Sequence, residues 1–389
     1  MKRMVWIVVA VALLVGSLPL QAGAVALDVA GKSALLMDVA TGQVIYEKNA
    51  HEPLPPASVT KVMTMLLIME AIDSGKIGWE DMVITSEAAA AKGGSQIYLK
   101  VGESMPVSDM VKSIAVSSAN DCACAMAEHL AGSEEAFVSL MNRRAEELGM
   151  GDTHFVNCTG LDDGEEAKDH RTSAFDIALM SRELLAKHPD IKKFTTIWMD
   201  TVRSGAFGLS NTNKLVRFYP GATGLKTGFT SGAGYCLSAS AQREDLELIA
   251  VVMGCETSQE RFSACKSMLD YGFANYALVS PQAEQLTVPV KLGKTAEVAA
   301  VPAQQSQLLV EKGQKSQVVL QTELEEAVTA PVSQGQKLGT LTVRLGDQTL
   351  AQIPLVAQAA VGRLSWWDIF KQLMGRMAMA KAVYEAGDS

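Results

Sequence analysis

The sequence predicts an α+β fold in which an antiparallel sheet is covered by a layer of helices. Two strand-like runs, residues 33–38 and 43–47, lie near the start of the chain, and two more, residues 234–241 and 246–253, lie much further along. The region between these pairs has mainly helical periodicity. Strands at both ends with helices between them favour a sheet built from the ends and a helical layer built from the middle.

The first helix of this layer is expected to begin at a serine. Residues 51–57 contain three prolines, which keep the chain extended and end any preceding element. Ser58 follows directly and opens a run that is apolar on nearly all sides, which is typical of a buried helix. The hydroxyl group of Ser58 is therefore expected at a helix N-terminus, close to free backbone N–H groups.

The composition of the chain changes near residue 278. Residues 257–277 have the pattern of a closing helix, and short alternating runs separated by glycines follow them. We expect residues 25–277 to form a catalytic domain and residues 278–361 a small all-β domain. The second domain has few groups with catalytic chemistry, so we expect it to act as a pedestal or spacer.

The first 24 residues resemble a secretory signal peptide. Lys2 and Arg3 precede an apolar stretch over residues 4–20, which ends at the small residues Ala22, Gly23 and Ala24. The alternative is an uncleaved N-terminal anchor, although the stretch is near the lower length limit for a membrane span. A signal peptide predicts that the mature protein is exported and works outside the cytoplasm.

Composition excludes some classes of function. The formal net charge is −9 and no long run of Lys or Arg occurs, so nucleic acid is not expected as a partner. Six cysteines, at positions 122, 124, 158, 236, 255 and 265, lack the spacing of a disulfide framework or a metal site. We expect mostly free, buried thiols and no cofactor, although an exported protein could pair its cysteines.

Residues 362–389 have the pattern of an amphipathic helix. Trp366, Ile369 and Phe370 recur at helical spacing, opposite a face that carries Lys371 and Arg376. Tryptophan on an apolar face opposite basic residues is typical of a helix lying in the membrane interface. We expect this segment to hold the protein on the outer face of the cytoplasmic membrane; the alternative is a helix packed on the β domain.

Three short motifs follow one another along the predicted catalytic domain. Each is weak alone: a second Ser-x-x-Lys occurs at residues 263–266 inside the closing helix, where a solvated helix face is expected. Their joint presence in this order, tens of residues apart, indicates a shared site. The motifs are Ser58-Val59-Thr60-Lys61, Ser118-Ala119-Asn120 and Lys226-Thr227-Gly228.

The chemistry of the lysines and the serine is mutually consistent. Serine is a poor nucleophile until a base takes its proton. Lys61 lies three positions after Ser58, so the two side chains share one face of a helix. Lysine acts as a base only when its pKa is lowered, which burial or a second cation achieves. Lys226 is a candidate for that cation, so this chemistry requires both lysines to converge on Ser58.

These motifs resemble the signature of the penicillin-binding protein and serine β-lactamase superfamily. The surrounding residues, among them 55–57, 160–162 and 219–221, are similar to those of the low-molecular-mass D-alanyl-D-alanine carboxypeptidases. The resemblance covers most of residues 28–277. It implies a five-stranded antiparallel sheet beside a helical subdomain, hydrolysis of peptidoglycan stem peptides that end in D-Ala-D-Ala, and acylation by β-lactams.

The resemblance also implies a role for each matching residue near the nucleophile. Ser58 attacks the carbonyl group between the two terminal D-alanines, and Lys61 is its general base. Ser118 relays a proton toward the leaving D-alanine. Asn120 holds Lys61 and the amide of the substrate.

Further roles are implied on the side of the third motif. The backbone N–H group of Phe229, with that of Ser58, forms the oxyanion hole. Lys226 and Thr227 bind the terminal carboxylate. Arg261 is either a further carboxylate-binding group or a surface charge on the closing helix.

Two cysteines depart from the family pattern. Cys122 stands where a small apolar residue is frequent, and Cys158 stands where proline is frequent. Because Cys122 is close in sequence to Ser118 and Asn120, a reactive thiol is an alternative to a buried small side chain.

The sequence leaves related activities open. A β-lactamase of class A needs a deacylating glutamate, but no Glu-x-x-Leu-Asn stretch follows the second motif, and Glu165 and Glu166 are expected to be solvated. An endopeptidase that cleaves D-Ala cross-links would use the same residues as a carboxypeptidase. A silent wall-binding protein would tolerate loss of Ser58, Lys61 and Lys226, all of which are present.

Overall fold

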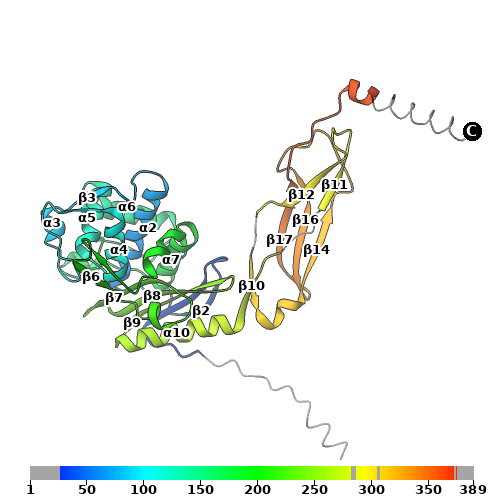
Figure 1. Cartoon of the computed structure of the whole chain (residues 1–389). Coiled ribbons are helices and arrows are strands. Elements are labelled where there is room, and N and C mark those ends of the chain that lie inside the picture. Colours follow the sequence, from blue (N-terminus) through cyan, green and yellow to red (C-terminus); the bar gives the residue numbers. More distant parts are fainter. Residues whose placement is uncertain (1–26, 282–285, 305–306, 372–373, 375–389) are drawn as a thin grey trace, which may run out of the picture.

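The computed structural model describes residues 27–281, 286–304, 307–371 and 374. Figure 1 shows a larger part, in which helices cover a sheet, and a narrower part made of strands. Strand β10 (Tyr276–Val279) leads from the first part to the second. The predicted signal peptide, residues 1–24, lies outside the described residues.

The larger part is built on a five-stranded sheet with the order β2-β1-β9-β8-β7. All neighbouring strands are antiparallel, which confirms the predicted α+β fold. Strand β7, which carries the third motif, forms one edge. The strands are β1 (Ser33–Asp38), β2 (Val44–Lys48), β7 (Ala222–Thr230), β8 (Gly234–Arg243) and β9 (Leu246–Cys255).

Helices cover both faces of this sheet. Successive side chains of a strand point to opposite faces, and on β1 Leu35 and Met37 join the core under the helical layer, whereas Ala34 and Leu36 join the core under α10 (Ser258–Asn275). Every residue of β1 is therefore buried. The sequence of α10 fixes its start, because Thr257 and Glu260 form a reciprocal capping box.

The chain between β2 and β7 forms the helical layer. Helix α2 (Lys61–Asp73) is buried along most of its length and packs against α7 (Ala174–Lys187), which confirms the predicted buried helix. The other helices are α3 (Glu87–Ala90), α4 (Val107–Ser117), α5 (Asn120–Ala131), α6 (Glu134–Glu147), α8 (Lys192–Thr195) and α9 (Leu215–Phe218). Two short two-stranded antiparallel sheets flank them, formed by β3 (Met82–Ile84) with β4 (Ser104–Pro106) and by β5 (Met199–Val202) with β6 (Phe207–Ser210).

The second part is all β, as predicted. Its six-stranded sheet has the order β14-β16-β17-β12-β11-β15 around a core that includes Val288, Leu341 and Leu355. The predicted domain boundary between residues 277 and 278 falls inside β10, which pairs with β13 (Leu308–Glu311). The six strands are β11 (Leu286–Lys291), β12 (Glu297–Pro302), β14 (Val318–Leu324), β15 (Val328–Thr329), β16 (Lys337–Leu345) and β17 (Gln348–Ala357).

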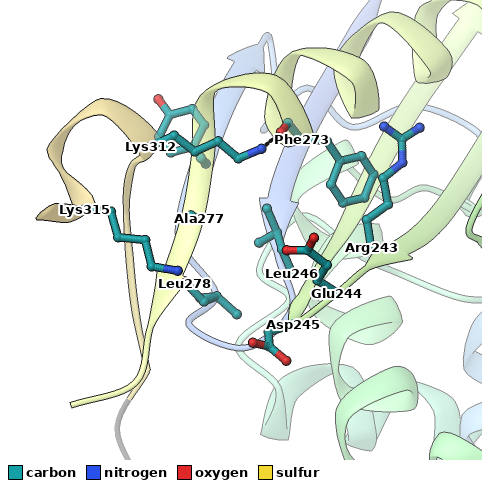
Figure 2. Close-up of a pocket in the computed structure, with 10 residues that line it drawn as sticks. Arg243, Glu244, Asp245, Leu246, Phe273, Ala277, Leu278, Lys312 and Lys315 are labelled. Carbon is teal, nitrogen blue, oxygen red and sulfur yellow. Dashed lines mark hydrogen bonds between the residues drawn. The ribbon is translucent and has the colours of Figure 1, made fainter. Parts of the chain in front are cut away.

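A cavity of about 210 Å³ lies where the two parts meet (Figure 2). It is lined by the turn between β8 and β9, the end of α10, β10 and the lysines that follow β13. Lys312 Nζ donates to the carbonyl oxygen of Phe273 at 2.6 Å, and the guanidinium of Arg243 lies 4.5 Å from the centre of the Phe273 ring. None of the predicted site residues lines this cavity, so we regard it as part of the joint between the two parts.

The described part of the C-terminal segment begins a helix at residues 366–371. Trp366 and Trp367 are exposed, and Trp366 stacks on Phe370 with 5.5 Å between ring centres. Most of the predicted amphipathic helix lies outside the described residues. Among the helices that the structure does describe, none is long and apolar enough to cross a membrane.

Candidate active site

Ser58 lies in a tight turn between the proline-rich segment and α2. Residues Ala57–Thr60 form a 3-10 turn and α2 begins at Lys61, so the serine precedes the α-helix by one turn. Thr60 Oγ1 donates to the carbonyl oxygen of Ala57 at 2.8 Å and lies 2.7 Å from Nε2 of His170. Burial lowers the pKa of His170 to about 4, so this ring is neutral and holds the turn by hydrogen bonding alone.

The loop at residues 157–161 packs directly against this turn. Gly160 has a φ of +81°, and a Cβ atom at this position would lie 1.8 Å from the carbonyl oxygen of Ala57. Only glycine fits so close an approach in this conformation. Asn157 Oδ1 accepts the N–H of Gly160 at 2.6 Å and the N–H of Thr159 at 3.1 Å, which fixes the loop in place.

Lys61 is fully buried and its amino group reaches the serine. Its Nζ lies 2.9 Å from Ser58 Oγ and donates to the carbonyl oxygen of Thr159 at 2.7 Å. Burial lowers the pKa of Lys61 to about 7, against opposing effects of Cys158 and Asp121. A large fraction of Lys61 is therefore unprotonated near neutral pH, and its lone pair can take the Ser58 proton.

Lys226 is the second buried lysine. It lies on β7 and its Nζ donates to the carbonyl oxygen of Thr227 at 2.9 Å. Burial lowers the pKa of Lys226 well below its usual value, and the charges of Lys61 and Arg261 lower it further. The sequence left open whether burial or a second cation depresses the pKa of Lys61; burial is the main cause.

The third motif runs along the Ser58 turn. A Cβ atom at Gly228 would lie 2.7 Å from the carbonyl oxygen of Pro56 and 3.1 Å from the backbone nitrogen of Ser58. The close neighbour of this glycine is therefore the backbone of the Ser58 turn. The edge of β7 and the nucleophile turn are thus brought together, as the shared-site hypothesis requires.

The second motif occupies the junction of α4 and α5. Ser118 ends α4 with a φ of +62°, which is uncommon for a residue other than glycine and is maintained only where the surroundings impose it. Asn120 is 2% exposed and its Nδ2 donates to the carbonyl oxygen of Gly93 at 2.8 Å. The expected hydrogen bond between Asn120 and Lys61 is not formed. Asn120 Oδ1 has no hydrogen-bond partner among the described residues, which leaves a buried acceptor unused.

Thr227 and Phe229 lie on the same strand but differ in exposure. Thr227 is buried and its Oγ1 donates to Thr212 Oγ1 at 2.7 Å. Phe229 is 53% exposed and stacks on Tyr235 with 4.2 Å between ring centres. The Thr227 hydroxyl is therefore held by a neighbour, whereas the Phe229 ring forms part of the surface.

Arg261 is buried rather than a surface charge of α10, so that alternative is wrong. Its Nη1 donates to the carbonyl oxygens of Gly228 at 2.9 Å and Cys236 at 3.3 Å. The guanidinium thus braces β7 from the α10 side of the sheet and adds positive charge next to Lys226.

The other candidates raised by the sequence have no catalytic surroundings. All six cysteines are free and buried, and burial raises the pKa of Cys122 well above its usual value, so its reactive thiolate is disfavoured. Lys266 of the second Ser-x-x-Lys is exposed and pairs with Asp270. Glu165 and Glu166 are exposed, as expected.

The arrangement suits nucleophilic acyl transfer. A hydroxyl group lies beside a buried amine of lowered pKa, and the charge of that amine in turn lowers the pKa of a second buried amine. Within the described ranges, no group of His, Cys, Asp and Glu side chains is arranged to hold a metal ion.

Comparison with known proteins agrees with this geometry. Residues 20–257 match the family described as D-alanyl-D-alanine carboxypeptidase. The chain belongs to this family. Residues 273–363 match the C-terminal domain of penicillin-binding protein 5. The chain therefore combines the carboxypeptidase domain with this second domain.

Individual family members cover nearly the whole chain. The D-alanyl-D-alanine carboxypeptidase DacF of Bacillus subtilis is 43% identical over 351 residues, which is 88% of this chain and 89% of that protein. The crystal structure of penicillin-binding protein 5 from Haemophilus influenzae superposes with a TM-score of 0.75 at 29% identity, over 86% of this chain and 98% of that one. Penicillin-binding protein D2 from Listeria monocytogenes, in its ampicillin-bound form, matches 64% of this chain and 99% of its own with a TM-score of 0.58 at 31% identity.

Proposed function

We propose that this chain removes the terminal D-alanine from peptidoglycan stem pentapeptides through an acyl-enzyme on Ser58, and that β-lactams acylate the same serine. One observation carries the proposal: Ser58 Oγ lies 2.9 Å from the amino group of a buried lysine whose pKa is about 7. The relatives with this chemistry are carboxypeptidases by name, and one related structure holds ampicillin.

In the proposed first step, neutral Lys61 takes the proton of Ser58 while the hydroxyl oxygen attacks the carbonyl carbon between the D-alanines. The carbonyl oxygen of Thr159 accepts an N–H of Lys61 and so turns the lone pair of the amine toward the serine. The backbone N–H groups of Ser58 and Phe229 stabilise the oxyanion, a contribution of about 3 kcal/mol for one such donor. Ser118 then carries a proton to the leaving D-alanine.

Substrate orientation is assigned to the remaining groups. Lys226 and Thr227 bind the terminal carboxylate, and Arg261 supports them through its bonds to the β7 backbone and through its charge. The unused Oδ1 of Asn120 accepts an amide N–H of the peptide. A water molecule then hydrolyses the acyl-enzyme and releases the shortened peptide.

Labelled penicillin tests this proposal. The wild-type protein is expected to form a stable adduct on a peptide that contains Ser58, and Ser58→Ala is expected to form none. Free D-alanine should then be released from a pentapeptide ending in D-Ala-D-Ala. Rapid turnover of the drug would instead show a β-lactamase, and cleavage confined to cross-linked dimers would show an endopeptidase.

We further propose that the protein is exported and rests on the outer face of the cytoplasmic membrane through residues 362–389, with residues 278–361 as the spacer. Exposed Trp366, Trp367 and Phe370 support an interfacial position. A chain that ends at Gly362 should keep its activity and lose binding to anionic vesicles. Undiminished sedimentation of that chain with vesicles would refute the attachment.

A further inference from the structure

A partly buried ion pair joins the segments that contain Lys92 and Glu134. Glu134 is the first residue of α6, and its side chain is 17% exposed. Its Oε2 pairs with Lys92, whose side chain is 25% exposed. Its Oε1 accepts the backbone N–H and the thiol of Cys158, each at 3.2 Å. One carboxylate therefore joins two loops that are distant in sequence.

Each partner of Glu134 is followed in the sequence by a residue whose backbone carbonyl oxygen accepts a hydrogen bond from an active-site side chain. Lys92 precedes Gly93, whose carbonyl oxygen accepts Nδ2 of Asn120 at 2.8 Å. Cys158 precedes Thr159, whose carbonyl oxygen accepts Nζ of Lys61 at 2.7 Å. The two carbonyl groups that orient the catalytic lysine and asparagine thus belong to loops held by the same side chain.

We infer that Glu134 is a positioning residue for acyl transfer, which sets Lys61 and Asn120 through the loops that carry Thr159 and Gly93. This inference rests on the proposed function of Ser58 and Lys61. Glu134 acts indirectly: its polar contacts are with Lys92 and Cys158, and it forms no hydrogen bond with Ser58 or Lys61. Its charge-assisted bonds to Lys92 and to the Cys158 N–H are stronger than bonds between neutral groups.

The surroundings of Glu134 keep it ionised. Burial acts to raise the pKa of Glu134, but the hydrogen bond and charge of Lys92 and the bonds from Cys158 outweigh it, so that this pKa is lowered. The other titratable groups that face it are thiols: Cys124 lies 3.9 Å from Oε2, and the pKa of Cys158 is raised well above its usual value, so that thiol is neutral. Lys92 is therefore the cation that compensates this carboxylate.

A displaced Thr159 carbonyl would leave the Lys61 amine free to turn away from Ser58. Misplacement of a catalytic group by about 1 Å can lower a rate on the order of 100-fold, even when the cause is remote. Lys226 and Thr227, which are assigned to the terminal carboxylate, form no hydrogen bond or ion pair with Glu134, so their part of substrate binding should survive. The amide contact of Asn120 should weaken together with the position of Lys61. The rate should therefore fall more than the substrate affinity.

The test compares three variants of the full chain at 25 °C. Glu134→Ala removes both connections, Glu134→Gln keeps an acceptor for the Cys158 N–H but loses the charge opposite Lys92, and Glu135→Gln changes the exposed neighbour as a matched control. The measurements are the second-order rate constant of Ser58 acylation by a fluorescent penicillin, kcat and KM for D-alanine release, and the melting temperature.

We expect Glu134→Ala to lower the acylation rate constant and kcat by about 10- to 100-fold, with a clearly smaller change in KM. Glu134→Gln should recover part of that loss. Equal rates in Glu134→Ala and Glu135→Gln, with both folded and wild type active, would overturn the inference even if the melting temperature of Glu134→Ala falls. If Glu134→Ala does not fold, Glu134→Gln decides: a kcat lowered by a larger factor than any change in KM supports the inference, and a kcat equal to that of the control overturns it. Failure of wild type itself to be acylated would refute the proposed function instead.

Discussion

The rate of Ser58 acylation is expected to follow the ionisation of Lys61. Only the neutral amine can accept the serine proton, and burial lowers the pKa of this amine from 10.5 to about 7. That difference corresponds to about 5 kcal/mol in favour of the neutral form. Below the pKa, each further unit of pH should lower the rate about tenfold, because the ammonium form has no lone pair to offer.

The size of the effect follows from the two pKa values. With a pKa of about 7, the neutral fraction of Lys61 is about 10% at pH 6 and about 90% at pH 8. The acylation rate constant should therefore rise roughly ninefold between pH 6 and pH 8 and level off above that. An ordinary lysine would instead give a rate that continues to rise tenfold per pH unit up to about pH 10.

Stopped-flow acylation by a fluorescent penicillin between pH 5.5 and 9.5, at constant ionic strength, measures this profile. His170 is the control, because an ordinary histidine titrates near 6.5 whereas burial lowers the pKa of His170 to about 4. His170→Asn should thus leave the midpoint near 7 even if the rate falls. A profile that is flat from pH 6 to 9, or one that still rises tenfold per pH unit at pH 9.5, would refute Lys61 as a neutral buried base.

Three further predictions concern the same region. Asp121→Asn removes a charge that raises the pKa of Lys61, so the midpoint of the acylation profile should move to lower pH; an upward move would contradict this. Between about pH 7 and 10.5, Lys61 binds a proton more readily in the unfolded chain than in the folded protein. The stability of the folded protein therefore falls as the pH decreases through this window. Lys61→Met should lose the part of this dependence that Lys61 contributes, while buried Lys226 keeps its own part. This variant should be more stable than wild type by about 4 kcal/mol at pH 7 in urea denaturation, and equal urea midpoints of the two proteins would contradict the prediction. Gly160→Ala should lower the free energy of unfolding by at least about 3 kcal/mol, because its Cβ meets the Ala57 carbonyl oxygen. The control Gly164→Ala, with a φ of +89° but open space around it, should lower it by about 1 kcal/mol. Similar losses in the two variants would refute the close approach.

Four of the five strands in the catalytic sheet could be predicted from the sequence because their apolar residues are dense. The sequence indicates strand β7 only weakly, since Gly224, Gly228 and its threonines dilute the apolar pattern that marks a strand. Its position beside the Ser58 turn depends on β8, with which it pairs along its length. The resemblance to the family, rather than periodicity, supplied the fifth strand.

The contact between Ser58 and Lys61 could be predicted because it is local, three residues apart. The acceptor that orients Lys61 could not, because it is the backbone carbonyl of Thr159, and a backbone group leaves no mark in residue type. The role of Glu134 could not be predicted either, because an acidic residue in the first turn of a helix is common. Its contacts with Lys92 and Cys158 depend on the tertiary structure. The burial of Arg261 likewise depends on how α10 packs under the sheet.

The six buried cysteines can report local unfolding on each side of the catalytic sheet. Cys122, Cys124, Cys158 and Cys236 belong to the core under the helical layer, whereas Cys255 and Cys265 belong to the core under α10. A thiol reagent can modify them only when the surrounding packing separates, since the native fold shields every sulfur atom. The order in which the six positions become labelled will therefore reveal which side of the sheet comes apart first.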